Sequence, residues 1–171
     1  YAEIVKEVDV KGNNRISLET IKVYGEINIG DDVSAFDVNI ILKNLYKTNF
    51  FEDVKISLSN GALNITVKEY AVINFIELKG EKSNTIKKSV LEKLQLKPKE
   101  SFIENKVLED VNLLKKIYGS IGYNFANVET KIEKFDNNRV NLIYLLDKGK
   151  KTNSAKINFI GDKKIKEKRL R

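Results

Sequence analysis

One sequence pattern occurs three times in the chain, and it constrains the fold more than any other feature. Each copy is a run of alternating apolar residues that ends in a glycine: Val8, Val10, Gly12; Ile76, Leu78, Gly80; and Ile157, Phe159, Gly161. Alternation at a period of two predicts a β-strand with one buried face, and the glycine predicts a turn directly after it. The glycines lie 68 and 81 residues apart (80 − 12 and 161 − 80). This spacing indicates repeated small domains, because solenoid repeats are shorter.

Two helices are predicted after each of the first two strands. Ser17 and Thr85 each lie five residues past the glycine and are the expected N-caps of the first helices. The second helices are predicted to begin at capping boxes, Ser34 with Asp37 and Ser101 with Glu104. Apolar residues then follow at helical spacing: Val38, Ile41, Leu42, Leu45 in the first copy and Val107, Val111, Leu114 in the second.

A hairpin closes each copy. Alternating apolar residues flank Asn60-Gly61, a strong hairpin signal, and a second pair of runs flanks residues 136–138. The order β-α-α-β-β therefore occurs twice, and two helices must cover one face of each small sheet. We expect an α+β fold of tandem repeats, each a three-stranded mixed sheet covered on one face by two helices. The expected boundaries are 1–70 and 71–149, with the start of a third repeat at 150–171.

The most distinctive residues lie where each second helix ends. Residues 45–54 read LYKTNFFEDV and residues 117–128 read IYGSIGYNFANV. Asn49 and Gly122 are the expected turn residues, because both types tolerate left-handed backbone geometry. The aromatic residues that follow are expected to fill the gap between helix and sheet.

These stretches resemble the signature of the POTRA domain, the polypeptide-transport-associated repeat. Asn49 replaces the glycine that the family usually has at that position. Glu69 stands where the family often has an acidic residue that closes a repeat, and Asp147-Lys148-Gly149 is a conservative departure from its usual acidic residue and glycine. The resemblance covers essentially the whole chain, as two complete repeats and the start of a third.

Composition favours binding over catalysis. The chain has no Cys and no His, which excludes thiol nucleophiles, Ser-His-Asp triads and ordinary transition-metal sites. The pairs Asp31-Asp32 and Glu52-Asp53 have no facing partner placed by the pattern, so we expect no enzyme and no cofactor. Repeated domains without catalytic groups are binding modules by default. An edge strand is the expected contact surface, because its unpaired N–H and C=O groups accept another strand by β-augmentation.

The resemblance implies which strand this is, namely the one after the second helix of each repeat. Its residues are Val54, Lys55, Ile56, Ser57 and Leu58 in the first repeat, and Val128, Glu129, Thr130, Lys131 and Ile132 in the second. It also implies the periplasmic region of an outer-membrane protein assembly factor, anchored by a C-terminal β-barrel outside this sequence. The implied partners are unfolded outer-membrane proteins, accessory assembly lipoproteins and periplasmic chaperones.

Two alternatives remain open. Within the same architecture, the parent could be a two-partner secretion transporter or a division protein. The other is an RNA-binding α+β protein of the KH type, suggested by the element order and by the G-x-x-G of Gly119 to Gly122. That motif follows the second helix, whereas in KH domains it joins the two helices, so turn chemistry is favoured.

The charge distribution also argues against a nucleic-acid partner. Of the net +7, residues 1–147 contribute −1 (21 basic, 22 acidic) and residues 148–171 contribute +8 (10 basic, 2 acidic). The two predicted repeats are thus nearly neutral, and the excess lies in the predicted start of the third.

Overall fold

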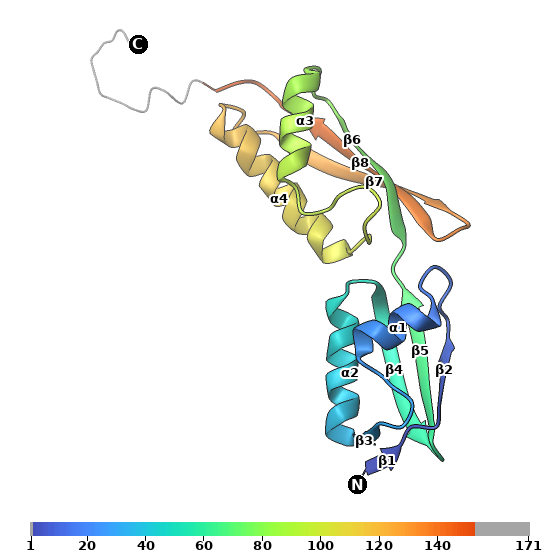
Figure 1. Ribbon diagram of the computed structural model, residues 1–171. Helices are drawn as coiled ribbons and strands as arrows, with labels where there is room; N and C mark the ends of the chain where they lie inside the picture. Colours follow the sequence, from blue (N-terminus) through green and yellow to red (C-terminus); the bar gives the residue numbers. More distant parts are fainter. Residues whose placement is uncertain (1, 153–171) are drawn as a thin grey trace. The chain divides into compact units, whose positions relative to one another are not determined.

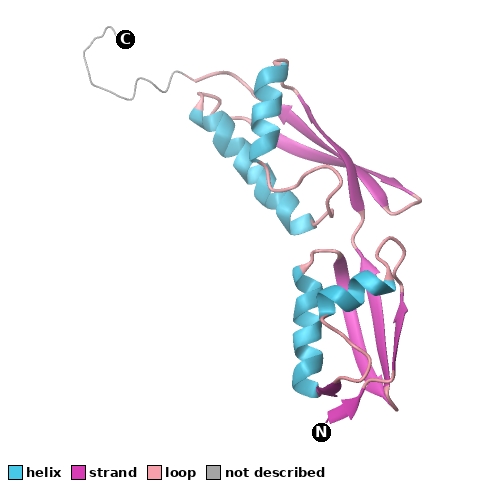
Figure 2. Ribbon diagram, in the orientation of Figure 1, coloured by secondary structure: helices cyan, strands magenta, loops and turns pink. Residues whose placement is uncertain are grey.

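The computed structural model describes residues 2–152 of the chain. They form two compact units, the first ending at Ala71 and the second beginning at Val72 (Figures 1 and 2). Residues 153–171, which hold most of the predicted start of a third repeat, lie outside the described part. Both units have helices packed on a mixed sheet, which confirms the predicted α+β class.

The first unit is built on a three-stranded sheet of order β2-β5-β4. Strands β2 and β5 pair in parallel, and β4 and β5 form an antiparallel hairpin. Helices α1 and α2 lie on one face of this sheet (Figure 1). The elements are β2 (Glu7–Lys11), α1 (Leu18–Gly25), α2 (Ala35–Lys47), β4 (Phe51–Ser59) and β5 (Ala62–Glu69).

The first unit also contains a small sheet that the sequence pattern does not predict. Strand β1 (Ala2–Ile4) pairs antiparallel with β3 (Asp32–Ser34), which leads directly into α2. Each strand has three residues, too few for a recognisable alternation. Val5 follows β1 and is fully buried, so this sheet fixes the N-terminal segment against the core.

The second unit repeats the arrangement. Its sheet has the order β6-β8-β7, with β6 and β8 parallel and β7 and β8 antiparallel. The elements are β6 (Val72–Lys79), α3 (Asn84–Lys93), α4 (Glu104–Ser120), β7 (Asn127–Phe135) and β8 (Arg139–Asp147). Both predicted hairpin turns are present, with left-handed backbone at Asn60, Gly61 and Asn138.

The glycine directly after β2 and the glycine directly after β6 are each required for a steric reason. Gly12 and Gly80 have φ of 89° and 105°, values that disfavour other residues. A Cβ at Gly12 would lie 2.0 Å from the Val67 carbonyl oxygen, and one at Gly80 would lie 1.9 Å from that of Leu146. Each glycine therefore lets the first strand leave the sheet directly beside its parallel neighbour.

The helix starts confirm half of the predicted caps. Ser17 caps α1, and Ser34 forms the predicted capping box with Asp37. The other two predictions are wrong. Helix α3 is capped by Ser83 in place of Thr85, and α4 begins after Ile103 with no side-chain cap.

Ser101 is drawn away from the predicted capping box because it pairs with the start of β6. It forms an isolated antiparallel bridge with Val72. The neighbouring amide of Ile73 donates to the Glu100 carbonyl at 2.9 Å. The loop before α4 is thus used as a strand-like cover for β6, and the helix begins later than the pattern indicates.

Candidate peptide-binding edge strands

The structure places both predicted binding segments on edge strands. Residues 54–58 lie in β4, and residues 128–132 lie in β7. Within the described residues 2–152, each of these strands has one neighbour, β5 and β8 respectively. Both are nine residues long, so each leaves a long row of backbone groups without a strand on its outer side.

Side chains along β4 alternate as the sequence predicts. Val54 is buried, Ile56 and Leu58 pack against the core, and Lys55 and Ser57 between them are exposed. On β7, Val128 is buried and Ile132 is half-buried, whereas Thr130 is exposed although it shares their side of the strand. The second edge is therefore more polar along its helix-facing side than the first.

One hydrogen bond shows which amides of β4 point away from the sheet. The Val54 amide donates to the hydroxyl oxygen of Tyr46 on α2, at 3.0 Å. Amide groups in an antiparallel pair point alternately toward and away from the neighbouring strand. The amides of Ile56 and Leu58 therefore point to the same open side as that of Val54.

The register of the two hairpins shows which amides of β7 point outward. Val54 lies opposite Val67, the residue beside Gly12, and Val128 lies opposite Leu146, the residue beside Gly80. Val54 and Val128 are thus equivalent. The outward amides of β7 are accordingly those of Val128, Thr130, Ile132 and Lys134.

The opposite edges of the two sheets are less suited to accept a strand. Strand β2 has five residues, whereas β4 has nine. The start of β6 is already covered, because Lys99 donates to the Ile73 carbonyl and Ile73 donates to that of Glu100. Among the described residues, the long edges without a neighbouring strand are those of β4 and β7.

The ends of α2 and α4 show how the two signature stretches align. Asn49 and Gly122 both have positive φ, as predicted, at 60° and 103°. Counting four residues back from each leads to Leu45 and Tyr118, which are both fully buried. Tyr118 is therefore equivalent to Leu45.

The aromatic residues after these turns differ between the units. Phe51 is buried and Phe50 packs against the same core, as predicted for the first unit. In the second unit Tyr123 packs edge-on against Tyr118, but Phe125 is 76% exposed. The prediction that aromatic residues fill the gap is wrong for Phe125.

A buried carboxylate at the end of β5 holds the loop after β2. Glu69 accepts hydrogen bonds from the backbone amides of Asn14, Arg15 and Ile16 at 2.7, 3.1 and 3.0 Å. Because these amides precede α1 and have no helical partner, the carboxylate fixes the path from strand to helix. The acidic residue noted at this position thus has a structural function.

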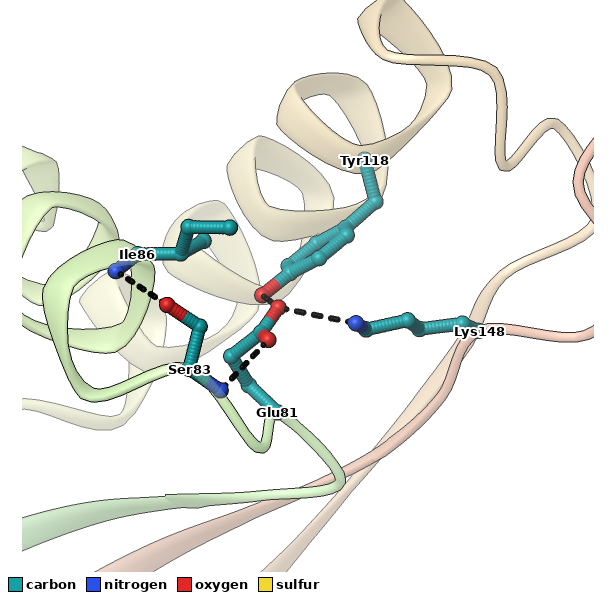
Figure 3. A network of polar contacts seen from close by, with 5 residues as sticks. All are labelled: Glu81, Ser83, Ile86, Tyr118 and Lys148. Carbon is teal, nitrogen blue, oxygen red and sulfur yellow. Dashed lines mark hydrogen bonds and ion pairs between the residues drawn. The ribbon is translucent and has the colours of Figure 1, made fainter.

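The second unit uses a different arrangement at the same place (Figure 3). Glu81, two residues after the end of β6, accepts hydrogen bonds from the Ser83 amide at 3.0 Å and from the Tyr118 hydroxyl at 2.8 Å. The Lys148 Nζ lies 3.0 Å from the same Glu81 carboxylate. Burial opposes ionisation of Glu81, but these three contacts outweigh it and hold its pKa below the ordinary value. Burial and the Glu81 charge raise the pKa of Tyr118.

The register shows that Lys148 is the counterpart of Glu69. Glu69 lies two residues after Val67, the residue beside Gly12, and Lys148 lies two residues after Leu146, the residue beside Gly80. The departure from the family pattern at 147–149 is therefore a charge reversal at this position. Its compensation, the carboxylate of Glu81, is 67 residues away in the sequence (148 − 81), so the local motif gave no signal for it.

Within residues 2–152, no group of three or more acidic side chains is placed to hold a metal ion. Across the same residues, no helix combines the length and the apolar character needed to cross a bilayer.

Comparison with known proteins identifies the repeat. The POTRA family model, described as "Surface antigen variable number repeat", matches residues 71–149, which span the described elements of the second unit. The N-terminal domain of Omp85 from Thermosynechococcus elongatus has a similar fold, with a TM-score of 0.54 at 16% identity over 84% of this chain and 63% of that chain. Residues 71–149 thus match the POTRA family, as the resemblance predicted for the second repeat.

The relatives point to one kind of POTRA protein. The chain is 28% identical over 169 residues to the outer membrane protein assembly factor BamA of Neisseria meningitidis serogroup B, covering 97% of this chain and 21% of the relative. It is 23% identical over 163 residues to BamA of Neorickettsia risticii, covering 95% and 22%. The chain therefore resembles the POTRA region of BamA and spans about a fifth of the length of these relatives.

Proposed function

We propose that the chain is the periplasmic POTRA region of an outer-membrane protein assembly factor. In this proposal, β4 and β7 bind extended segments of unfolded outer-membrane proteins by β-augmentation, and the repeats also dock accessory assembly lipoproteins and periplasmic chaperones. The parent protein would be held in the outer membrane by a C-terminal β-barrel. The proposal extends to this chain the activity named for its BamA relatives.

The observation that carries the binding mode is the repeated edge. In both units the strand after the second helix is long, lies at the sheet edge and directs alternate amides outward. Main-chain hydrogen bonds recognise backbone and are largely indifferent to side chains. Such an edge suits a protein that must receive many different substrate strands.

Amide NMR with a strand-forming peptide tests the binding mode. The probe is a capped peptide of about ten residues with alternating polar and apolar side chains, the pattern of a transmembrane β-strand. It should shift or broaden amide signals within the segments 54–58 and 128–132. Shifts confined to the helices would contradict β-augmentation.

A proline substitution sharpens the experiment. Thr130 is exposed and its amide points outward, so Thr130→Pro removes one open donor without removing a β7–β8 hydrogen bond. We expect weaker peptide binding at β7 and unchanged shifts at β4, which serves as the control within the same molecule. Equal binding at β7 in the variant would show that its main-chain donors are not used.

A further inference from the structure

The two edges differ at their first outward amide. In the first unit, the Tyr46 hydroxyl accepts a hydrogen bond from the Val54 amide at 3.0 Å and donates to the Asp53 carboxylate at 3.3 Å. The strand register shifts between Phe51 and Asp53, directly before this contact. A side chain from α2 thus occupies the place that the carbonyl of an added strand would take on Val54.

In the second unit, no side chain among residues 72–152 takes this place. Asn49 and Gly122 donate in the same way to the carbonyls of Tyr46 and Gly119, at 3.2 and 3.1 Å. Gly119 is therefore the counterpart of Tyr46. Among the described residues, the Val128 amide has no side-chain partner on the open side of β7.

We propose that Tyr46 closes the beginning of the β4 edge and that Gly119 leaves the corresponding part of β7 open. An added strand then pairs from Ile56 onward on β4 but from Val128 onward on β7. The second repeat thereby offers the longer pairing edge and binds extended outer-membrane protein segments more tightly. This inference rests on the proposed function, because it concerns how tightly each of the same two edges binds the same class of substrate.

Reciprocal substitutions test the inference on the 171-residue chain. Tyr46→Phe removes the hydroxyl and keeps the ring, so it should release the Val54 amide. Gly119→Tyr supplies the missing side chain, and its Cβ fits, because its nearest neighbour would be the Asn124 side-chain oxygen at 3.7 Å. Tyr24→Phe, at a half-exposed tyrosine on α1, is the control for losing a hydroxyl. Gly119→Ala is the control for replacing the helix glycine.

The readouts are peptide titration followed by amide NMR and hydrogen exchange of Val54 and Val128. In the wild type, peptide shifts should begin at Ile56 on β4 and at Val128 on β7. Tyr46→Phe should extend the β4 shifts to Val54, speed its exchange and tighten binding at β4 about fivefold, the effect of one net hydrogen bond. Gly119→Tyr should slow Val128 exchange and weaken binding at β7 by about the same factor. Both controls should behave as wild type.

The outcomes separate this inference from the proposed function. If the peptide shifts amide signals over equal lengths of β4 and β7, or if neither reciprocal variant changes affinity, then Tyr46 and Gly119 do not set the length of the binding edges. β-Augmentation would still stand in that case. If the peptide shifts neither edge in any variant, the proposed function fails and this inference fails with it.

Discussion

The core of the second unit contains two buried tyrosines with different polar surroundings. The Tyr118 hydroxyl donates to the Glu81 carboxylate. The Tyr144 hydroxyl has no hydrogen-bond partner among residues 2–152, and burial and the Asp110 charge raise its pKa. The hydroxyl of Tyr118 is therefore buried with a hydrogen bond, whereas the hydroxyl of Tyr144 is buried without one among these residues.

These surroundings predict opposite results for the same substitution. Tyr118→Phe should lower the free energy of unfolding of the second unit by about 1.5–3 kcal/mol, because it removes a hydrogen bond to a buried charge. Tyr144→Phe should be neutral or slightly stabilising, since no hydrogen bond is lost. Urea unfolding followed by amide NMR signals of the second unit measures both. Equal costs would contradict the assignment.

The Glu81 site also predicts a pH dependence. Its folded-state pKa lies below the ordinary value of 4.5, so the ionised form contributes stability above that value. This contribution is lost as the pH falls through the lowered pKa. The difference in unfolding free energy between wild type and Glu81→Gln should therefore shrink from about pH 6 to about pH 3. A difference that stays constant on acidification would contradict the lowered pKa.

At the scale of elements, the start of α3 has two candidate N-cap residues, which lie two positions apart in the sequence. The Ser83 hydroxyl accepts a hydrogen bond from the Ile86 amide at 3.2 Å, whereas Thr85 is exposed in the first turn. Ser83→Ala should therefore cost about 1 kcal/mol. Thr85→Ala should stay within about 0.5 kcal/mol of the wild type. Thermal unfolding of the two variants checks the difference, and the reverse order would restore the predicted cap.

The elements show how far sequence patterns reach. Alternation and turn residues predicted the strands of both main sheets and their hairpins, because side-chain periodicity directly reflects which face is buried. Strand β1 was missed because three residues show no period. The cap at Ser101 was wrongly predicted because a tertiary contact with Val72 competes with the local capping box.

In the candidate site too, features that follow from local sequence patterns were predicted and tertiary contacts were not. The hydrophobic pattern predicted the order of elements, and the POTRA resemblance implied that the strand after the second helix is the binding edge. The Tyr46–Val54 contact and the Glu81 network were not predicted, because they depend on side chains from separate elements. Glu81 and Tyr118, for example, are 37 residues apart in the sequence. A pattern indicates which face a residue occupies, but not which hydrogen bond it makes across the fold.

At the scale of the molecule, the charge distribution predicts the response to nucleic acid. Residues 1–152 carry a net +2, from −1 for residues 1–147 and three lysines at 148, 150 and 151. A chain that ends at Thr152 should therefore bind peptide as the full chain does and show no binding to single-stranded RNA. Any RNA binding by the full chain should fall steeply with added salt. Salt-resistant RNA binding by the shorter chain would favour the RNA-binding alternative.

The charge reversal between Glu69 and Lys148 has a consequence for how the repeats can recombine. A hybrid that joins the last strand of the first repeat to the front half of the second would set the carboxylates of Glu69 and Glu81 against each other. The reciprocal hybrid would offer a lysine to the amides of Asn14, Arg15 and Ile16, which need an acceptor. Like charges and unpaired amides destabilise a buried site. The two repeats share one plan, but their halves are matched as pairs and are not interchangeable parts.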